Sequence, residues 1–349
     1  MGNNITKQLF LRGAILALSI FSMSQWAMAQ EEDDKFSLTV TGAGVQGYYK
    51  VVYETFNGIL RDEYPEASVT FRPSSPAGGL VFIADGKADL SLAAGAPEIQ
   101  YAIEGKPPYP RSLKGDLRSV MQLFNTQTFH FVLNKDVADE YGVYSFADIA
   151  KKKPPLTIAI NRQGNLQVVD VAKDIFEAHG FSIEDLQSWG GQVSWVASGT
   201  GLEQLQDRKA DMFMNVRFVP DARVNEIIRS QDLVWVEADQ DALESVADKW
   251  GYEVITIDQS NYPELMDTSQ PTITQWSALL AGPHVPDAVV YKFIKALVDN
   301  KKRVQQVHPS LKAFSAEEAV KIVNLDVPLH PGAERFYREL DLLEQGKTR

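Results

Sequence analysis

The strongest constraint on the fold is an alternation of strand-like and helix-like patterns that occurs twice along the chain. Apolar residues alternate, as they do in strands, over residues 36–40, 68–72, 88–92, 156–160, 193–196 and 212–216. They recur at helical spacing over residues 48–60, 80–84, 166–178, 202–206, 288–307, 315–323 and 332–344. The β-α-β-α order predicts an α/β fold with mostly parallel sheets and helices on both faces.

A six-residue repeat connects the two halves of this pattern. DGKADL (85–90) and DRKADM (207–212) both lie between a short helix and a strand. A chain of 349 residues exceeds the size at which one hydrophobic core usually stops growing. Length and repeat together predict two similar α/β lobes.

The expected organisation places one lobe between the two parts of the other. We expect residues 30–128 to form the N-terminal part of lobe 1, residues 129–271 to form lobe 2, and residues 272–349 to complete lobe 1 as a return segment and C-terminal helices. The stretches 129–135 and 272–281 would connect the lobes as a strand hinge. Ligands in such sheets bind outside the carboxyl ends of the strands, so a central cleft is expected to be the binding site.

The N-terminus has the order of a secretory signal peptide. Lys7 and Arg12 precede an apolar stretch at 14–21, and Ala27-Met28-Ala29 follows, so residues 1–29 are expected to be cleaved after Ala29 on export. The apolar stretch is shorter than the ~20 residues that span a bilayer. The chain has no cysteine, which excludes disulfides, thiolate metal sites and a lipid-anchored N-terminal Cys. A periplasmic location fits these features.

Charge and motifs exclude several classes of function. The formal net charge is −12, whereas nucleic-acid binding depends on clustered Lys and Arg. The five histidines are scattered, and neither an H-E-x-x-H pair nor a G-x-S-x-G elbow occurs. We therefore predict no catalytic residue, no metal, no cofactor and no nucleic-acid partner.

The glycine-rich segment TGAGVQGYY (41–49) leaves two interpretations open. Gly42, Gly44 and Gly47 spell G-x-G-x-x-G between a strand and a helix, as in dinucleotide-binding loops. The same turn also exposes backbone N–H groups to any small anion. A dinucleotide site needs an acid about 20 residues further on; this chain has Arg72 there instead. An exported NADP-type oxidoreductase that uses the three glycines and Arg72 is therefore the alternative to a binding protein.

Three motifs together resemble one receptor family. TGAGVQGYY (41–49), DGKAD (85–89) and PLHPGAERFY (328–337) are similar to segments of the TAXI group of solute receptors, which serve TRAP (tripartite ATP-independent periplasmic) transporters. The resemblance implies a type II periplasmic-binding-protein fold, whose two lobes close over a small organic anion. It further implies delivery of a dicarboxylate, 2-oxo acid or acidic amino acid to TRAP membrane permease subunits by a monomer. A ligand-sensing subunit for a membrane kinase would have the same cleft.

The sequence departs from the family pattern in two loops that face the cleft in the family. The usual Gly-Gly-Ser-type turn is replaced by SSPAGG (74–79), and small residues of the first loop of lobe 2 are replaced by NRQGN (161–165). A ligand other than the family's familiar ones is therefore compatible with this sequence, and residues of both loops enter the candidate site.

The candidate ligand-binding residues lie in these loops or near the expected hinge. They are Gly44, Val45, Gln46, Gly47, Tyr48, Ser74, Ser75, Ala77, Phe129, Arg162, Gln163, Gly164, Asn165, Ser198, Asn215, Arg217 and Trp276. Arg162 and Arg217 each follow a strand and could grip a carboxylate with two parallel bonds, although a surface ion pair is the commoner role of an arginine. Tyr48 and Trp276 are the aromatic residues expected to form cleft walls, with core packing as the alternative.

Overall fold

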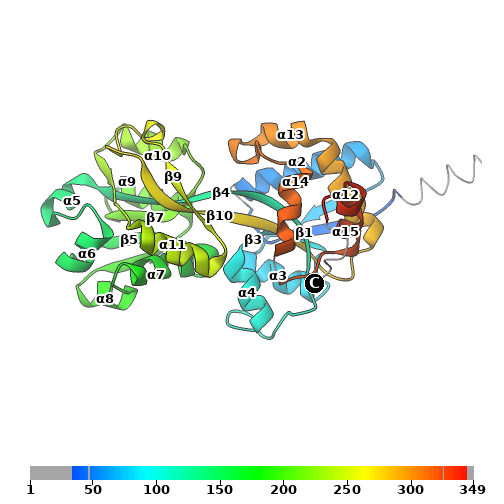
Figure 1. Cartoon of the computed structure of the whole chain (residues 1–349), viewed down its shortest axis with the longest axis horizontal. Helices are drawn as coiled ribbons and strands as arrows, with labels where there is room; N and C mark the ends of the chain where they lie inside the picture. The colour runs from blue at the N-terminus through cyan, green and yellow to red at the C-terminus, as the bar shows by residue number, and fades with distance from the viewer. Residues whose placement is uncertain (1–33, 46–47, 325, 344–349) are drawn as a thin grey trace, which may run out of the picture.

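The computed structural model describes residues 34–45, 48–324 and 326–343, and it consists of two α/β lobes joined by two long strands (Figure 1). These strands are β4 (Arg118–Asn134) and β10 (Gln270–Ala281). The predictions for the signal peptide at 1–29, for Gln46 and for Gly47 lie outside the described residues. None of the described helices is both long and apolar enough to cross a bilayer.

The strands of both lobes belong to one continuous sheet in the described part of the chain, in the order β2-β1-β3-β10-β4-β7-β5-β6. Lobe 1 contributes β1 (Ser37–Thr41), β2 (Ser68–Phe71) and β3 (Leu90–Ala94). Lobe 2 contributes β5 (Thr157–Ile160), β6 (Gln192–Trp195), β7 (Met212–Arg217), β8 (Leu233–Trp235) and β9 (Glu253–Ile257). Strand β8 pairs with β4, and β9 pairs with β10.

Strand directions make the two lobes face each other. The strands β1, β2 and β3 are mutually parallel, and β3 runs in the same direction as β4 because both are antiparallel to β10. The strands β5, β6 and β7 are also parallel, and β7 is antiparallel to β4. The carboxyl ends of the two parallel triplets therefore point toward each other, as predicted for a fold with a central cleft.

The helices cover both faces of the sheet. Lobe 1 has α2 (Tyr48–Glu63), α3 (Pro76–Ala84), α4 (Ala96–Glu104), α12 (Asp287–Asp299), α13 (Lys301–Val307), η2 (Pro309–Leu311), α14 (Ala316–Ala319), η3 (Val320–Asn324) and α15 (Pro331–Glu339). Lobe 2 has α5 (Lys135–Tyr141), α6 (Phe146–Lys152), α7 (Leu166–Ala178), α8 (Ile183–Ser188), α9 (Ser198–Gln206), α10 (Ala222–Ile228), α11 (Gln240–Trp250) and η1 (Gln259–Asn261). In lobe 1, one apolar cluster includes α2, α12 and α15, and a second includes α3 and α4 (Figure 1).

The repeated hexapeptide performs the same task in both lobes. The Asp89 carboxylate accepts a hydrogen bond from the Thr39 amide at 2.6 Å, and the Asp211 carboxylate accepts one from the Thr157 amide at 2.7 Å. Each aspartate thereby ties the start of its third strand to the first strand of its lobe. The turn before it is left-handed in both, at Gly86 (φ 66°) and at Arg208 (φ 57°).

Several predicted boundaries were wrong. The hinge strand β4 begins at Arg118, eleven residues before the predicted 129, and β3 lies two residues later than predicted, at Leu90–Ala94. The predicted helix 288–307 is divided at Asn300 into α12 and α13. Helix α4 was missed, because its nine residues include a proline and give only a short periodic pattern.

Candidate ligand-binding site between the lobes

The two loops that depart from the family pattern meet across the lobes. Ser75 accepts a hydrogen bond from the Gly78 amide at 3.1 Å and so caps α3, with Pro76 at the first helical position. Gly164 lies opposite, so close that a Cβ added to it would stand 3.9 Å from the Ser75 Cβ. Ser75 and Gly164, both predicted site residues, are therefore in contact in this structure, and the lobes are closed on one another there.

The glycine-rich loop after β1 owes its conformation to close packing. Gly42 has φ +89°, and a Cβ added there would lie 2.2 Å from the Leu92 carbonyl oxygen. A Cβ on Gly79 of α3 would lie 2.5 Å from the Gly42 Cα. Only glycine permits this approach of the loop to α3 and β3. Beyond Gly42, the predicted site residues Gly44 and Val45 are exposed to solvent.

Two groups required by the dinucleotide interpretation are already engaged. The Gly42 amide donates to the Ser74 hydroxyl at 2.9 Å, and the same hydroxyl is 2.9 Å from the Thr41 hydroxyl. The Arg72 guanidinium lies 4.0 Å from the centre of the Phe82 ring and donates to the Lys87 carbonyl at 3.1 Å. The predicted residue Ser74 therefore fastens the loop, and this arrangement disfavours a phosphate at Gly42 and Arg72.

The loop before α7 carries a cationic side chain, Arg162, close in sequence to the contact between Gly164 and Ser75. The Arg162 and Gln163 side chains are exposed, and the Arg162 guanidinium bonds to no other described residue. Its backbone is fixed, because the Arg162 amide donates to the Asn161 side chain at 2.8 Å. Asn165 directly precedes α7, and its Oδ1 atom is buried with no hydrogen-bond partner among the described residues.

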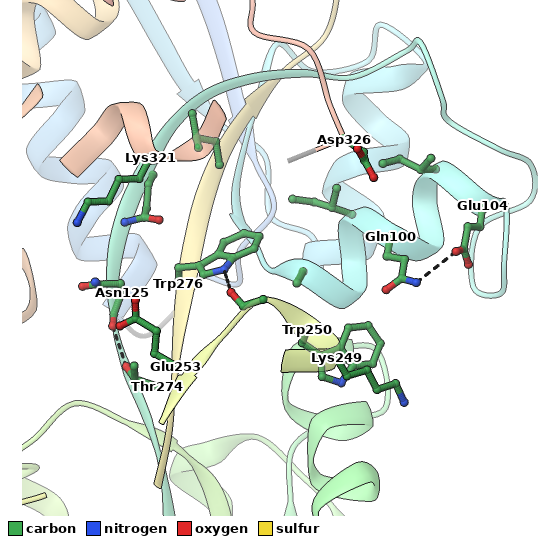
Figure 2. Close-up of a pocket in the computed structure, with 16 residues that line it drawn as sticks. Gln100, Glu104, Asn125, Lys249, Trp250, Glu253, Thr274, Trp276, Lys321 and Asp326 are labelled. Atoms are coloured by element: carbon green, nitrogen blue, oxygen red, sulfur yellow. Dashed lines mark hydrogen bonds between the residues drawn. The ribbon is translucent and has the colours of Figure 1, made fainter. Parts of the chain in front are cut away.

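The two aromatic residues predicted as cleft walls lie in different apolar clusters. The Tyr48 ring packs against Phe218 of lobe 2 with centroids 4.5 Å apart, and its hydroxyl lies 2.6 Å from that of Ser310. The Trp276 indole points elsewhere, beside α4, and donates to the Gly251 carbonyl at 3.0 Å (Figure 2). The structure therefore does not bring Tyr48 and Trp276 together around one ligand.

Two further predicted residues are core residues in this structure. Phe129 is fully buried and stacks on Phe131 within the apolar cluster of lobe 2. Ala77 is buried with Leu80 in the cluster beneath α3. Their position supports the packing alternative that attends any apolar residue near a strand end.

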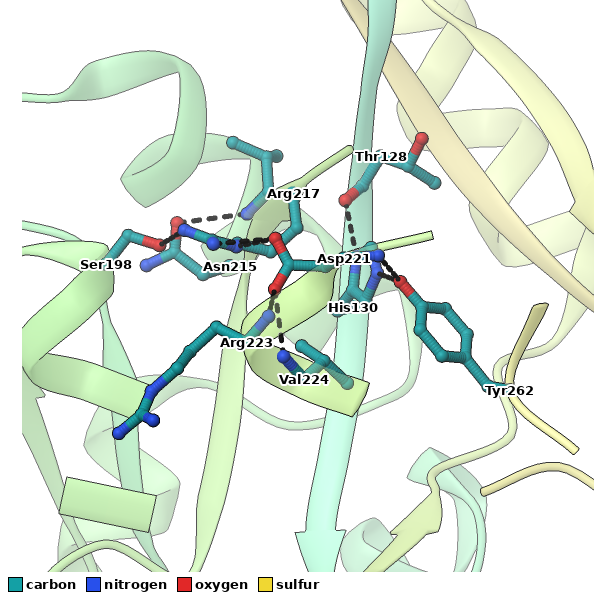
Figure 3. A network of polar contacts seen from close by, with 10 residues as sticks. Thr128, His130, Ser198, Asn215, Arg217, Asp221, Arg223, Val224 and Tyr262 are labelled. Carbon is teal, nitrogen blue, oxygen red and sulfur yellow. Dashed lines mark hydrogen bonds and ion pairs between the residues drawn. The ribbon is translucent and has the colours of Figure 1, made fainter. Parts of the chain in front are cut away.

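The second predicted arginine is held in a polar network (Figure 3). The Arg217 Nε and Nη2 atoms lie 2.7 and 2.6 Å from one Asp221 carboxylate oxygen, and Nη1 donates to the Ser198 hydroxyl at 3.2 Å. The other Asp221 oxygen caps α10 by accepting from the amides of Arg223 and Val224. A guanidinium has five N–H groups, so Arg217 keeps donors for a ligand while its position is fixed.

A buried histidine, His130, is connected to this network through Tyr262. His130 Nδ1 donates to the Thr128 carbonyl at 2.9 Å, so its Nε2 accepts from the Tyr262 hydroxyl at 2.9 Å (Figure 3). The Tyr262 oxygen in turn accepts from the Asp221 amide at 2.7 Å. Burial lowers the pKa of His130 to about 4, so this imidazole is neutral at physiological pH. Its role is to position the start of α10.

Asn215, another predicted residue, lies between the two arginine loops. Its Oδ1 accepts from the Asn161 side chain at 3.2 Å and from the Val216 amide at 3.0 Å. Its Nδ2 is buried without a partner. Asn161, which also fixes the Arg162 amide, thus connects the loop after β5 with the end of β7.

The sequence did not identify a buried polar seam between the lobes. Glu98 of α4 is fully buried, and its Oε1 accepts from the Gln167 amide of α7 at 3.0 Å. Gln275 of the hinge donates from Nε2 to the Gln167 carbonyl at 2.5 Å. Burial raises the pKa of Glu98 from 4.5 to about 7, although hydrogen bonds from the backbone of Gln167, Glu98 and Gly95 lower it.

Five buried polar atoms near the facing strand ends and the hinge have no partner among the described residues. They are Glu98 Oε2, Asn165 Oδ1, Gln167 Oε1, Asn215 Nδ2 and Gln275 Oε1. Each unsatisfied buried polar group costs about 1–3 kcal/mol. These atoms can form hydrogen bonds with water or with a bound solute.

A family model decides the relationship to known proteins. The model of the NMT1-like family matches residues 40–340. The chain belongs to the NMT1-like family.

Solved structures place this NMT1-like chain in a known fold. It is 14% identical to MatC from Rhodopseudomonas palustris, solved with bound malate, with a TM-score of 0.53 over 88% of this chain and 99% of MatC. The alkanesulfonate-binding protein SsuA from Xanthomonas axonopodis pv. citri, bound to MOPS, is 11% identical with a TM-score of 0.45, over 86% of this chain and 83% of SsuA. The NMT1-like chain has the two-lobe α/β fold of periplasmic binding proteins, as predicted.

The donors and acceptors of the NMT1-like chain suit non-covalent capture. Arg162, Arg217 and Ser198 offer N–H and O–H groups from lobe 2, and α3 of lobe 1 begins at the contact with Gly164. Within the described residues, no three His, Asp or Glu side chains gather as they would around a metal ion. What the arrangement can do chemically is to surround a small polar solute with hydrogen-bonding groups from both lobes.

Proposed function

We propose that this chain is a periplasmic solute receptor of a TRAP transporter. It captures a small organic anion by closing its lobes and delivers it to the membrane permease. The observation that supports this most is the contact between loops of both lobes at Ser75 and Gly164, together with buried polar atoms near the facing strand ends that can hydrogen-bond to a solute. The family and the two-lobe fold agree with a receptor.

The charges at the seam favour an anion. The Arg162 guanidinium is exposed and unpaired among the described residues, and Arg217 retains free N–H groups beside Ser198. An arginine can bind a carboxylate through two parallel charge-assisted bonds. The start of α7, which follows Asn165, adds backbone N–H groups at the positive end of a thirteen-residue helix. A carboxylate between these groups would be held by lobe 2 and covered by lobe 1.

Binding of carboxylates to the mature chain tests this function. Malate, which is bound to the MatC structure, together with 2-oxoglutarate and glutamate, should be titrated by calorimetry. We expect Arg162→Ala to weaken binding by at least about tenfold, which equals about 1.4 kcal/mol, because one charge-assisted interaction is lost. The melting temperature without ligand should not change, since the side chain contacts no other described residue.

The matched control is Arg229→Ala, which removes an exposed arginine from the same lobe, one that forms no ion pair with a described residue. It should bind as the wild type does. Equal affinity of Arg162→Ala and the control would remove Arg162 from the site. Absence of carboxylate binding at millimolar concentrations would contradict the anion class. Uptake by vesicles that contain the TRAP permease, with and without the receptor, tests delivery.

A further inference from the structure

A second cavity, of about 500 Å³, lies beside the hinge strands (Figure 2). Its walls come from α4, the end of α11, β9, the hinge strands β4 and β10, and the C-terminal segment around η3. None of the described residues in the loops 42–45, 74–77 and 161–165 lines it. The cavity is therefore separate from the seam proposed above to bind the anion, and it has the size of a small-molecule site.

Two tryptophans form the aromatic wall of this hinge cavity. The Trp276 Nε1 donates to the Gly251 carbonyl at 3.0 Å, and the Trp250 Nε1 donates to the Asp174 carboxylate at 2.6 Å. With both N–H groups occupied inside the protein, the indoles offer only their rings to the cavity. The Lys249 ammonium already lies 5.0 Å from the centre of the Trp250 ring. Indole rings attract cations in this way, and Trp is the best such ring.

The charges that line the cavity leave an excess of carboxylate. Lys249 pairs with Asp174 at 2.7 Å, and Lys321 pairs with Glu318 at 2.7 Å. Glu253 and Asp326 line the cavity and form no ion pair with a described residue (Figure 2). Both lysines are thus compensated from outside the cavity, whereas these two acids are not. The local field favours a positively charged occupant.

Two carboxamides of β4 also line the cavity. Gln122 of β4 is 9% exposed, lines the cavity, and its carboxamide forms no hydrogen bond with any described residue. The Asn125 side chain, three residues further along β4, lines the cavity too and forms no hydrogen bond with a described residue. Each carbonyl oxygen can accept a hydrogen bond from an N–H group of an occupant.

We propose that the hinge cavity binds a small organic cation, an ammonium or guanidinium compound. Its charged group lies beside the Glu253 carboxylate, its apolar part lies against the Trp276 ring, and Gln122 accepts a hydrogen bond from one of its N–H groups. Glu253 belongs to lobe 2, whereas Gln122 and Asp326 belong to lobe 1. An occupant that contacts both lobes favours the closed arrangement seen here, because these residues lie around one cavity only when the lobes are so placed.

Titration of the mature chain with choline, putrescine and agmatine tests the proposal, with binding followed by calorimetry and by tryptophan fluorescence. Potassium chloride at equal ionic strength controls for screening. We expect saturable binding of at least one organic cation and an affinity lower by about tenfold, or about 1.4 kcal/mol, in Glu253→Gln. Glu253 is exposed and pairs with no described residue, so this variant should melt as the wild type does.

Two controls separate the cavity from other surfaces. Glu264→Gln removes an exposed, unpaired carboxylate elsewhere in lobe 2 and should leave cation binding unchanged. Arg162→Ala should also leave it unchanged, so failure of the anion site and failure of the cation site are distinguishable. Absence of saturable binding at millimolar concentrations overturns the proposal, and so does equal affinity of Glu253→Gln and Glu264→Gln for the cation.

Discussion

The two lobes have equivalent hydrogen bonds, which Asp89 and Asp211 accept from their first strands. They differ in how the buried acid that follows the third strand is paired. In lobe 2, Asp221 is paired with Arg217 of its own lobe and caps α10. In lobe 1, Glu98 has no cationic partner among the described residues and accepts one of its hydrogen bonds from the Gln167 amide of the opposite lobe. Lobe 2 therefore satisfies its acid by itself, whereas lobe 1 completes the environment of Glu98 only by closing.

The loops after the first strand also differ between the lobes. Counted from the two aspartate-bonded threonines, Thr39 and Thr157, Gly44 and Arg162 each lie five residues further on. The lobe 1 loop is packed through Gly42 against α3 and β3, whereas the lobe 2 loop exposes the Arg162 side chain. The two lobes therefore share the hydrogen bond between the first and third strands. They differ in the loops beyond the strand ends, where a solute would bind.

The largest effect is expected from Gly42→Ala. The added Cβ would meet the Leu92 carbonyl oxygen at 2.2 Å, and φ at this residue is +89°. Since the obstacle is backbone, we expect the free energy of unfolding to fall by more than about 3 kcal/mol. Urea denaturation of the mature chain measures it. In lobe 2, Gly199→Ala adds a Cβ that meets nothing within 4 Å and should change stability little. Equal effects would mean that the neighbours of Gly42 yield to an added Cβ.

The next largest effect concerns Glu98 and the pH dependence of the free energy of unfolding. The folded chain binds the Glu98 proton more tightly than the unfolded chain does, because burial raises this pKa from 4.5 to about 7. The free energy of unfolding contributed by Glu98 therefore falls as pH rises through that range, by on the order of 3 kcal/mol. Glu98→Gln removes the titrating group and should lose this part of the pH dependence.

Urea denaturation at about pH 5 and about pH 8 checks this expectation, with the difference between the two pH values compared in wild type and Glu98→Gln. A variant that shows the wild-type pH dependence would mean that Glu98 is ionised at no cost in the closed protein. The contrast with Asp221 would then lose its energetic meaning.

The smallest effect tests the repeated turn. Arg208 has φ 57° where lobe 1 has Gly86 at φ 66°. Arg208→Gly and Arg208→Ala both lose the exposed ion pair with Asp136, so their difference isolates the backbone. We expect the glycine variant to be more stable by about 1 kcal/mol, and Gly86→Ala to cost a similar amount. Thermal and urea denaturation measure both. Identical stability of the two Arg208 variants would show that the turn is relaxed in lobe 2.

Local periodicity was sufficient to predict much of the fold. Helix α7 begins at Leu166 and ends at Ala178, as the apolar spacing predicts, and the repeated hexapeptide correctly indicates two similar lobes. These features are determined by residues close together in the sequence. The length of β4 was missed because its pairing with β10 depends on residues more than a hundred positions away.

Contacts between lobes account for most of what the sequence did not reveal at the site. Glu98 stands in the first turn of a short helix, where an acid usually faces solvent near the helix N-terminus. In the folded chain it is buried, and its carboxylate contacts α7 of the other lobe. Trp276 and Tyr48 were grouped by residue type, but Tyr48 begins helix α2, Trp276 lies on strand β10, and the two rings pack against different apolar clusters. The assignments of Arg162, Arg217 and Ser198 to a ligand stay predictions.

The pairing of β4 with β10 has a consequence for how such receptors diversify. The chain leaves lobe 1 and returns to it through two adjacent antiparallel strands that pair at Thr128 and Thr274, so the ends of the segment 129–273 are neighbours in space. Recombination at these two points would exchange a whole half of the receptor as one cassette, with its own folding core and its own arginine-bearing loop. A new ligand selectivity could thus be acquired in a single genetic event, while lobe 1 keeps its fold.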